Sequence, residues 1–337
     1  MRILSALVAA ALLLLALGGP ASAQTAPGKM TGGIVYALPA WFKPSFFDFR
    51  EDVEEARKAK RHVLLFLHLD ECPYCARMLQ ENFVSGDNRD FMQQHFDVIG
   101  INVRGASEVK WLDGKTYTER SFSRMLKTFG TPTLVFLGPH GDVLLKLSGY
   151  RDPGALRGAL EYVQSAAYLK QPFAAYAAAR DKPAVYTLRD HPQFAKRTDF
   201  KGYAKPLAVL FEDRGCIDCA RFHDKTLNHP DVAAELKPFL FVRLDTDSGT
   251  PVVDIDGKRV TPAQWAQALG LTHRPALALY HEGREIARVD GLLYHFHFKE
   301  RLRYVSGGHY KRMSASEYST ARRSELLKQG VNIDYSE

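Results

Sequence analysis

Two short stretches, Asp70-Glu71-Cys72-Pro73-Tyr74-Cys75 and Arg214-Gly215-Cys216-Ile217-Asp218-Cys219, carry all four cysteines of the 337-residue chain. In each stretch the two cysteines stand three positions apart, about one helical turn, so their sulfur atoms can form a disulfide. If a helix begins at the first cysteine, its unpaired backbone N–H groups and its dipole favour the thiolate there. Both stretches therefore predict a redox-active dithiol. Cys72 and Cys216 are the expected nucleophiles, and Cys75 and Cys219 the cysteines that resolve the mixed disulfide.

The two stretches belong to a unit that the chain contains twice, at an offset of 144 residues. In both copies an apolar run precedes the cysteines, a second run follows them, and a proline stands 60 or 59 residues after the first cysteine. The matching segments are 62–67 and 206–211, 96–103 and 240–244, the turns 112–115 and 255–258, and the strands 130–137 and 272–280. Apolar runs of this length, separated by helical stretches and glycine-containing turns, indicate buried strands. The chain is thus an internal duplication.

The order of elements within a unit predicts the fold class. Each unit reads as strand, helix with the cysteine pair, strand, helix, strand, strand and helix, which indicates an α/β fold with a mixed central sheet flanked by helices. We expect two such domains in tandem. The expected boundaries are a first domain over 24–167, a helical linker over 168–199, a second domain over 200–312 and a C-terminal helix or tail over 313–337. Ser314-Ala315-Ser316-Glu317 matches a capping box for that last helix.

The first 23 residues have the pattern of a secretory signal. Arg2 is followed by an apolar run from Ile3 to Leu17, and Ala21-Ser22-Ala23 supplies small residues at a cleavage site. The run is shorter than the roughly 20 residues of a membrane-spanning helix. This pattern predicts export and a periplasmic location.

The charge of the chain gives no sign of a nucleic-acid partner. The formal net charge is +7, and the basic residues are spread along the chain instead of forming one tract. Groups such as 57–61 are most simply solvated helix faces.

Other uses of paired cysteines fit the spacing less well. A zinc ribbon usually has its pairs about 15–20 residues apart, whereas 140 residues separate Cys75 from Cys216. Covalent haem attachment requires a histidine after the second cysteine, and alanine stands there in both copies. A purely structural disulfide stays an alternative, more so for the second pair.

His68, His295 and His297 are weaker candidates for a functional site than the cysteines. His295 and His297 alternate with phenylalanines where the closing helix of the second unit begins, and without a third ligand in view we interpret them as helix-end residues. His68 is interpreted as a partly buried polar residue. No metal ion and no cofactor are expected.

The residues quoted above resemble the thioredoxin superfamily, and within it most closely the periplasmic SoxW-type thioredoxins. The resemblance covers roughly residues 45–165 and 200–312. Besides the cysteine pairs, it is carried by Gly130-Thr131-Pro132-Thr133 and Arg274-Pro275. It implies that Pro132 and Pro275 are cis and face the cysteines, and that Thr131 and Arg274 offer backbone groups to an extended substrate segment. One departure concerns the buried acid that thioredoxin has six residues before its first cysteine, because Phe66 and Leu210 stand there.

The resemblance implies a thiol–disulfide oxidoreductase, a protein disulfide reductase that acts on periplasmic protein disulfides. A membrane thiol transporter of the DsbD type is the implied electron donor. Carboxylates near each first cysteine, Asp70, Glu71 and Asp218, oppose thiolate formation and favour a reductant over a strong oxidase. We also expect the two sites to differ, since Thr131 precedes one proline and Arg274 the other, and to be close enough for relay. The alternative is a binding module for a client or a copper-loaded partner, with structural or metal-carrying cysteines.

Overall fold

The first domain is built on a four-stranded mixed sheet. The computed structural model describes residues 26–128, 130–180 and 182–336. The sheet has the order β3-β2-β6-β7, with β2 (His62–His68) parallel to β3 (Phe96–Asn102) and antiparallel to β6 (Thr133–Leu137), which in turn pairs with β7 (Val143–Ser148). The helices are α1 (Phe49–Lys58), α2 (Pro73–Asn82), α3 (Asp87–His95), α4 (Glu119–Met125) and α5 (Pro153–Gln164).

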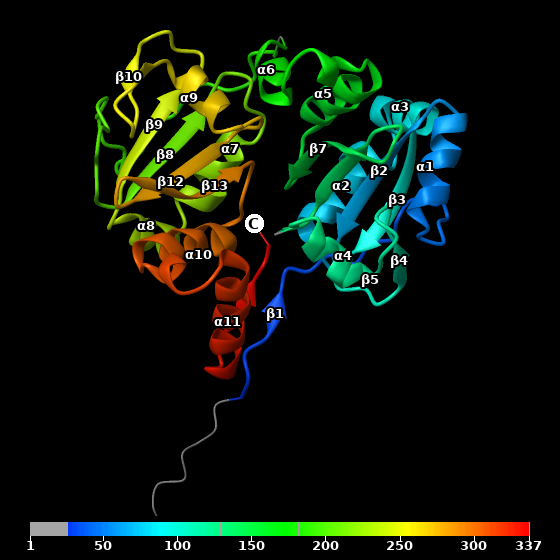
Figure 1. The fold of residues 1–337 in the computed structure, drawn as a ribbon. Coiled ribbons are helices and arrows are strands. Elements are labelled where there is room, and N and C mark those ends of the chain that lie inside the picture. The colour runs from blue at the N-terminus through cyan, green and yellow to red at the C-terminus, as the bar shows by residue number, and fades with distance from the viewer. Residues whose placement is uncertain (1–25, 129, 181, 337) are drawn as a thin grey trace, which may run out of the picture.

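The second domain repeats this topology. Its sheet has the order β13-β12-β8-β9, formed by β8 (Leu207–Glu212), β9 (Leu240–Asp245), β12 (Ala276–His281) and β13 (Arg284–Asp290). Its helices are α7 (Cys219–Arg221), the π-helix η2 (Phe222–Leu227), α8 (Pro230–Leu236), α9 (Pro262–Ala268) and α10 (His295–Ser306). The identical strand order confirms the duplication, and Figure 1 shows the two domains side by side.

The two predicted turns close short antiparallel hairpins at equivalent places. In the first domain β4 (Glu108–Lys110) pairs with β5 (Thr116–Thr118), and in the second β10 (Val252–Val253) pairs with β11 (Arg259–Val260). Gly114 and Gly257 have φ values of 81° and 86° in these turns, a left-handed conformation that glycine adopts without steric cost.

Strand alternation divides the core into layers, and one of these layers crosses from domain to domain. In β2, Val63, Leu65 and Leu67 pack toward α1 and α4, whereas Leu64 and Phe66 pack toward α2 and α5. In β8, the alternate residues Ala208 and Leu210 belong to the same buried cluster as Leu64 and Phe66. The α2 side of the first domain and the α10 side of the second therefore share one continuous apolar core.

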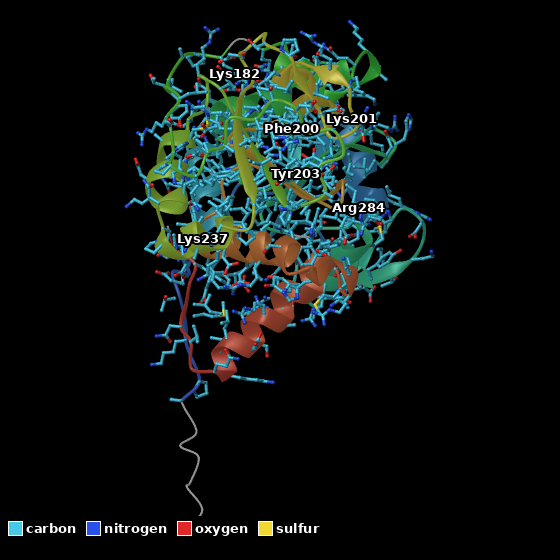
Figure 2. All side chains as sticks on the ribbon, turned by 90° about the vertical axis from the view of Figure 1, so that its left-hand side faces the viewer. Lys182, Phe200, Lys201, Tyr203, Lys237 and Arg284 are labelled. Atoms are coloured by element: carbon cyan, nitrogen blue, oxygen red, sulfur yellow. A yellow bond between two sulfur atoms is a disulfide. The ribbon has the colours of Figure 1, made fainter. Side chains whose placement is uncertain are left out.

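The linker is less helical than the sequence indicated. A 3₁₀ turn (Ala167–Leu169) and the short helix α6 (Phe173–Ala178) are its only helical parts among the described residues of the predicted linker 168–199. Beyond α6 the chain runs as an irregular segment, in which Val185 and Tyr186 both donate backbone hydrogen bonds to Arg214 O. Pro183 and Pro192 in this segment lack the N–H that a helix interior needs. The segment then leads to Phe200, labelled in Figure 2, which is fully buried in the core of the second domain.

The tail pairs with the segment that precedes the first sheet. Helix α11 (Ala315–Lys328) starts with the predicted capping box of Ser314 and Glu317, after a 3₁₀ turn (His309–Lys311). Strand β14 (Ile333–Asp334) then pairs in parallel with β1 (Met30–Thr31), which precedes the first domain. The predicted signal over 1–23 lies outside the described residues. Within the described part of the chain, no helix has the length and apolar character needed to cross a membrane.

Candidate functional site

The first cysteine pair has the helix geometry that its sequence predicts. Cys72 is the N-cap of α2 and forms a disulfide with Cys75, with 5.2 Å between their Cα atoms. The backbone N–H of Cys75 donates to Cys72 Sγ at 3.1 Å. Cys72 is 6% exposed and Cys75 is fully buried. A sulfur at this position faces the positive end of a ten-residue helix, which favours a thiolate at Cys72 after reduction.

The second cysteine pair departs from this geometry. Cys216 and Cys219 also form a disulfide, with 5.5 Å between Cα atoms, but helix α7 begins only at Cys219 and spans three residues before the π-helix η2. The expectation that Cys216 stands at a helix N-terminus is therefore wrong. The N-cap residue of α7 is Asp218. Its carboxylate makes no capping hydrogen bond to the helix and instead binds Arg77 of the first domain.

Both prolines that follow the cysteine pairs are cis, as the resemblance implied. Thr131 lies directly against the first pair, since its hydroxyl donates to Cys72 Sγ at 3.4 Å. Arg274 is directed elsewhere: its guanidinium donates to His273 O at 2.8 Å and lies 3.5 Å from the Asp213 carboxylate. The two residues before the prolines thus differ in contact as well as in charge.

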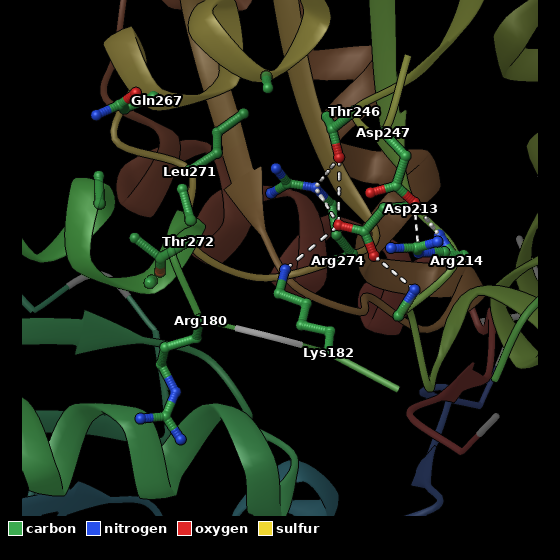
Figure 3. A pocket seen from close by; sticks show the side chains of 15 residues that line it. Arg180, Lys182, Asp213, Arg214, Thr246, Asp247, Gln267, Leu271, Thr272 and Arg274 are labelled. Carbon is green, nitrogen blue, oxygen red and sulfur yellow. Dashed lines mark hydrogen bonds and ion pairs between the residues drawn. The ribbon is translucent and has the colours of Figure 1, made fainter. Parts of the chain in front are cut away.

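A charged cavity of about 220 Å³ borders the second pair, between α6, α9 and the loop that leads to Cys216 (Figure 3). Its charged lining residues are Arg180, Lys182, Arg214, Arg274, Asp213 and Asp247. Asp213 binds Lys182 at 3.3 Å as well as Arg274, so one carboxylate offsets part of the positive charge of these two side chains. Burial lowers the pKa of Arg274, although the charge of Asp213 opposes this.

A buried polar group stands four residues before each first cysteine, at the end of the central strand. In the first domain it is His68, whose Nδ1 lies 3.0 Å from the Tyr36 hydroxyl. Burial lowers the pKa of His68 and raises that of Tyr36.

In the second domain the same position is Glu212, which is fully buried. It binds His223 Nε2 at 2.9 Å and lies 3.5 Å from the hydroxyl of Tyr186. Burial, with the charge of Glu212, raises the pKa of Tyr186 to about 12. Tyr186 packs in one buried cluster with Cys216 and Cys219. His68 was predicted to be a partly buried polar residue, and Glu212 was not predicted as a site residue. The signal in the sequence is that a polar residue follows or ends the apolar run before each cysteine pair.

The residue between the first two cysteines contacts the second domain. Tyr74 is 7% exposed, and its ring stacks on Tyr294 at a centroid distance of 4.2 Å. Its hydroxyl accepts a hydrogen bond from Tyr294 N at 2.8 Å and lies 3.1 Å from His297 Nδ1. Burial lowers the pKa of His297 to about 4, with help from the charge of Arg301. His295 and His297 begin α10, as predicted for helix-end residues, and the described residues contain no group of three or more potential metal ligands.

The residue between the second two cysteines contacts the first domain. Asp218 is 2% exposed and accepts a hydrogen bond from Arg77 Nη2 at 2.8 Å. Arg77 also binds Glu81 and lies over the ring of Tyr150 at 3.9 Å. Burial alone would lower the pKa of Arg77, but the hydrogen bond to Asp218 and its charge raise it above its usual value.

The arrangement provides two disulfides on facing sides of two domains, and each domain contains one cis-proline. A disulfide with one helix-capping sulfur is suited to exchange with an external thiol or disulfide, because that sulfur is the stabilised leaving group. The second pair lacks this helix contribution, so its chemistry depends on neighbouring side chains.

Comparisons with known proteins agree with the duplicated fold. The family model described as a thioredoxin-like domain matches residues 49–164 and 194–306. Among solved structures, a thioredoxin-fold protein from Helicobacter pylori is 18% identical over 41% of this chain and 91% of that chain, with a TM-score of 0.35. A thioredoxin from Thermus thermophilus is 23% identical over 35% and 84%, with a TM-score of 0.28. A protein disulfide oxidoreductase from Aeropyrum pernix is 12% identical over 82% and 100%, with a TM-score of 0.25. No curated protein matches the chain.

Proposed function

We propose a function on the premise that the chain belongs to the thioredoxin-like domain family, whose model matches it twice. The function is thiol–disulfide exchange with protein disulfides through two Cys-x-x-Cys sites, in the reductive direction. The chain acts in the periplasm after removal of its signal, and a membrane thiol transporter of the DsbD type supplies electrons.

One observation carries this proposal: Cys72 caps α2 and receives hydrogen bonds from Cys75 N–H and the Thr131 hydroxyl. In the reduced protein these groups stabilise the Cys72 thiolate, which attacks a disulfide of the client. One client sulfur then bonds to Cys72 and the other leaves as a thiolate. Cys75 then attacks Cys72 Sγ. This releases the client sulfur that was bonded to Cys72 and restores the Cys72–Cys75 disulfide seen in the structure.

The reductive direction is supported by the charges around the cysteines. A strong oxidant requires a highly stabilised first thiolate, whereas Asp70 and Glu71 precede Cys72, and Asp218 lies two residues after Cys216. Negative charge near a thiol opposes its ionisation. Asp70 is held beside the site by Asn102, whose amide donates to both of its carboxylate oxygens at 3.0 and 3.1 Å.

The test is the dithiothreitol-driven reduction of insulin by the full chain and by four variants. We expect the wild type to accelerate reduction, Cys72→Ser to lose most of the acceleration, and Cys216→Ser to retain part of it. Val143→Ser, an exposed change on β7, is the matched control. Full activity of the Cys72→Ser/Cys216→Ser double variant, or no acceleration by a folded wild type, would overturn the proposal and favour a binding module. Fractionation of the native host with detection of the mature N-terminus tests the location.

A further inference from the structure

The two Cys-x-x-Cys motifs lie on one shared surface between the domains. Tyr74 and Asp218 occupy positions between the cysteines of their motifs, and each is buried against the opposite domain. Helices α2 and α7 lie on the sides of the domains that face each other (Figure 1). Around them Arg151 Nη2 binds the Asp290 carboxylate at 2.6 Å, and the apolar cluster is continuous across both domains. Each redox motif is therefore packed against the other domain of the same chain.

This docking changes the electrostatics of the second site. The side chains of Arg77 and Asp218 are 14% and 3% exposed, so their charges are poorly screened by water. By itself, the Asp218 carboxylate opposes a thiolate at Cys216. The guanidinium of Arg77, 2.8 Å from that carboxylate, offsets the negative charge. The cation comes from the α2 helix of the other site, so the Cys216 thiolate forms most readily while the domains are docked.

The two sites also stabilise their thiolates unequally. Cys72 faces the N-terminus of a ten-residue helix and receives two hydrogen bonds. In the described part of the chain Cys216 Sγ receives neither a backbone nor a hydroxyl hydrogen bond, and the helix after it begins at Cys219. A better stabilised first thiolate means a more stable dithiol and a more oxidising disulfide. Electrons therefore flow from the second pair to the first.

We propose that the chain catalyses disulfide exchange between its own domains, with the Cys216/Cys219 dithiol reducing the Cys72–Cys75 disulfide. This inference rests on the proposed function of both sites. The Cys216 thiolate attacks Cys72 Sγ, the slightly exposed sulfur of the pair, and Cys75 leaves as a thiolate. Cys219 then attacks Cys216 Sγ, and Cys72 leaves as the thiolate that α2 stabilises. Two electrons pass to the first site, and the two thiol protons of Cys216 and Cys219 pass to Cys72 and Cys75. An external dithiol reduces the second site again.

The first experiment traps the intermediate in the full chain. The Cys75→Ser/Cys219→Ser variant keeps only the two nucleophiles and is oxidised with diamide after reduction. We expect a Cys72–Cys216 disulfide within one chain, identified by peptide mass, and its yield should be unchanged from 1 to 100 µM protein because tethered sites react at high effective concentration. Only disulfide-linked dimers, or free thiols at both positions, would overturn the relay.

The second experiment tests the Arg77 contact. Arg77→Gln in the trapping background should slow formation of the interdomain disulfide at least tenfold, since it removes the cation beside Asp218. Arg57→Gln, which removes an exposed arginine paired with Glu54 on α1, should leave the rate unchanged. Equal rates for Arg77→Gln and Arg57→Gln would contradict the docking role.

The third measurement separates failure of the relay from failure of the proposed function. Insulin reduction is measured for the single-site variants Cys72→Ser and Cys216→Ser. Separately, the wild type is treated with one equivalent of dithiothreitol. With one equivalent, alkylation and peptide mass should find Cys72 and Cys75 reduced before Cys216 and Cys219. If the remaining site in each variant is active but no interdomain disulfide forms, the relay is wrong and the proposed function stands.

Discussion

The hydroxyl of Tyr74, between the first two cysteines, accepts the backbone N–H of Tyr294 at the start of α10, 2.8 Å away in the other domain. This bond joins a redox motif to the helix that closes the second unit. Tyr74→Phe keeps the stacked ring but removes the hydroxyl. Loss of a buried hydrogen bond of this kind costs about 1–3 kcal/mol. Urea unfolding should show that loss.

The matched control for Tyr74→Phe is Tyr117→Phe, which removes a hydroxyl bonded to Asp113 on the exposed β4–β5 hairpin. We expect a loss below about 0.5 kcal/mol for this exposed bond. Equal effects of the two substitutions would show that the Tyr74 hydroxyl contributes no special stability to the domain interface.

His297, beside the Tyr74 hydroxyl, should make stability depend on pH. Its pKa is about 4 in the folded protein, because of burial, against 6.5 unfolded. Between these pH values the unfolded chain binds a proton that the folded chain does not. The contribution of neutral His297 to the free energy of unfolding is therefore fully present above pH 6.5 and is lost as the pH falls toward 4. The expected loss is about 2 kcal/mol on going from pH 7 to 4.5, at 1.36 kcal/mol per pKa unit.

His297→Phe should reduce that pH dependence by the same amount in urea unfolding at pH 7 and 4.5. His273, whose pKa is also lowered well below its usual value by burial, titrates in both proteins and therefore cancels in the comparison. An unchanged difference between the two pH values would contradict the assignment to His297.

Glu212 should be the most sensitive polar position near the second site. Glu212→Ala removes the buried partner of His223 Nε2 and should cost about 1–3 kcal/mol, because it leaves a buried polar group without its hydrogen bond. Glu212→Gln keeps an acceptor for His223 and should cost less. Glu54→Ala, at an exposed helix pair, should cost under about 1 kcal/mol. Chemical denaturation of the three variants measures this order, and a loss for Glu212→Ala as small as that for Glu54→Ala would contradict it.

Cys72 should form its thiolate at lower pH than Cys216, because only Cys72 caps an α-helix. The measurement is the rate of iodoacetamide alkylation against pH in two variants that each keep one cysteine. These are Cys75→Ser/Cys216→Ser/Cys219→Ser for Cys72 and Cys72→Ser/Cys75→Ser/Cys219→Ser for Cys216. Cys72 and Cys216 are 6% and 3% exposed, so access to both is restricted and the midpoint of each curve, not its plateau, is compared. Midpoints in the opposite order would reverse the direction of electron flow inferred above.

The sequence predicted the parts of the molecule that depend on local pattern and on repetition. Apolar runs, turns and the 144-residue offset indicated both sheets, and the Pro73 and Cys72 arrangement indicated the start of α2. These features follow from residues close together in the chain. The cis state of Pro132 and Pro275 followed from the family resemblance and is present in the structure.

The features that could not be predicted from the sequence depend on contacts between residues far apart in the chain. Cys216 is not a helix cap, and the side chain of Asp218 reaches Arg77, 141 positions earlier in the chain. The linker leaves its helix after Ala178, and its Tyr186 packs against the second cysteine pair. Glu212 becomes informative only once His223 and Tyr186 are placed around it. Local sequence patterns do not predict contacts between residues that are far apart in the chain.

The parallel pairing of β1 with β14 gives the two domains a second connection. The linker over 168–199 joins them covalently. The backbone bonds from Ile333 to Lys29 and from Tyr335 to Thr31 join the segment before the first domain to the segment after the second. Separation of the two domains is therefore limited by two tethers, the linker and the β1–β14 pair. A complete separation of the domains would require the backbone hydrogen bonds of that pair to break first.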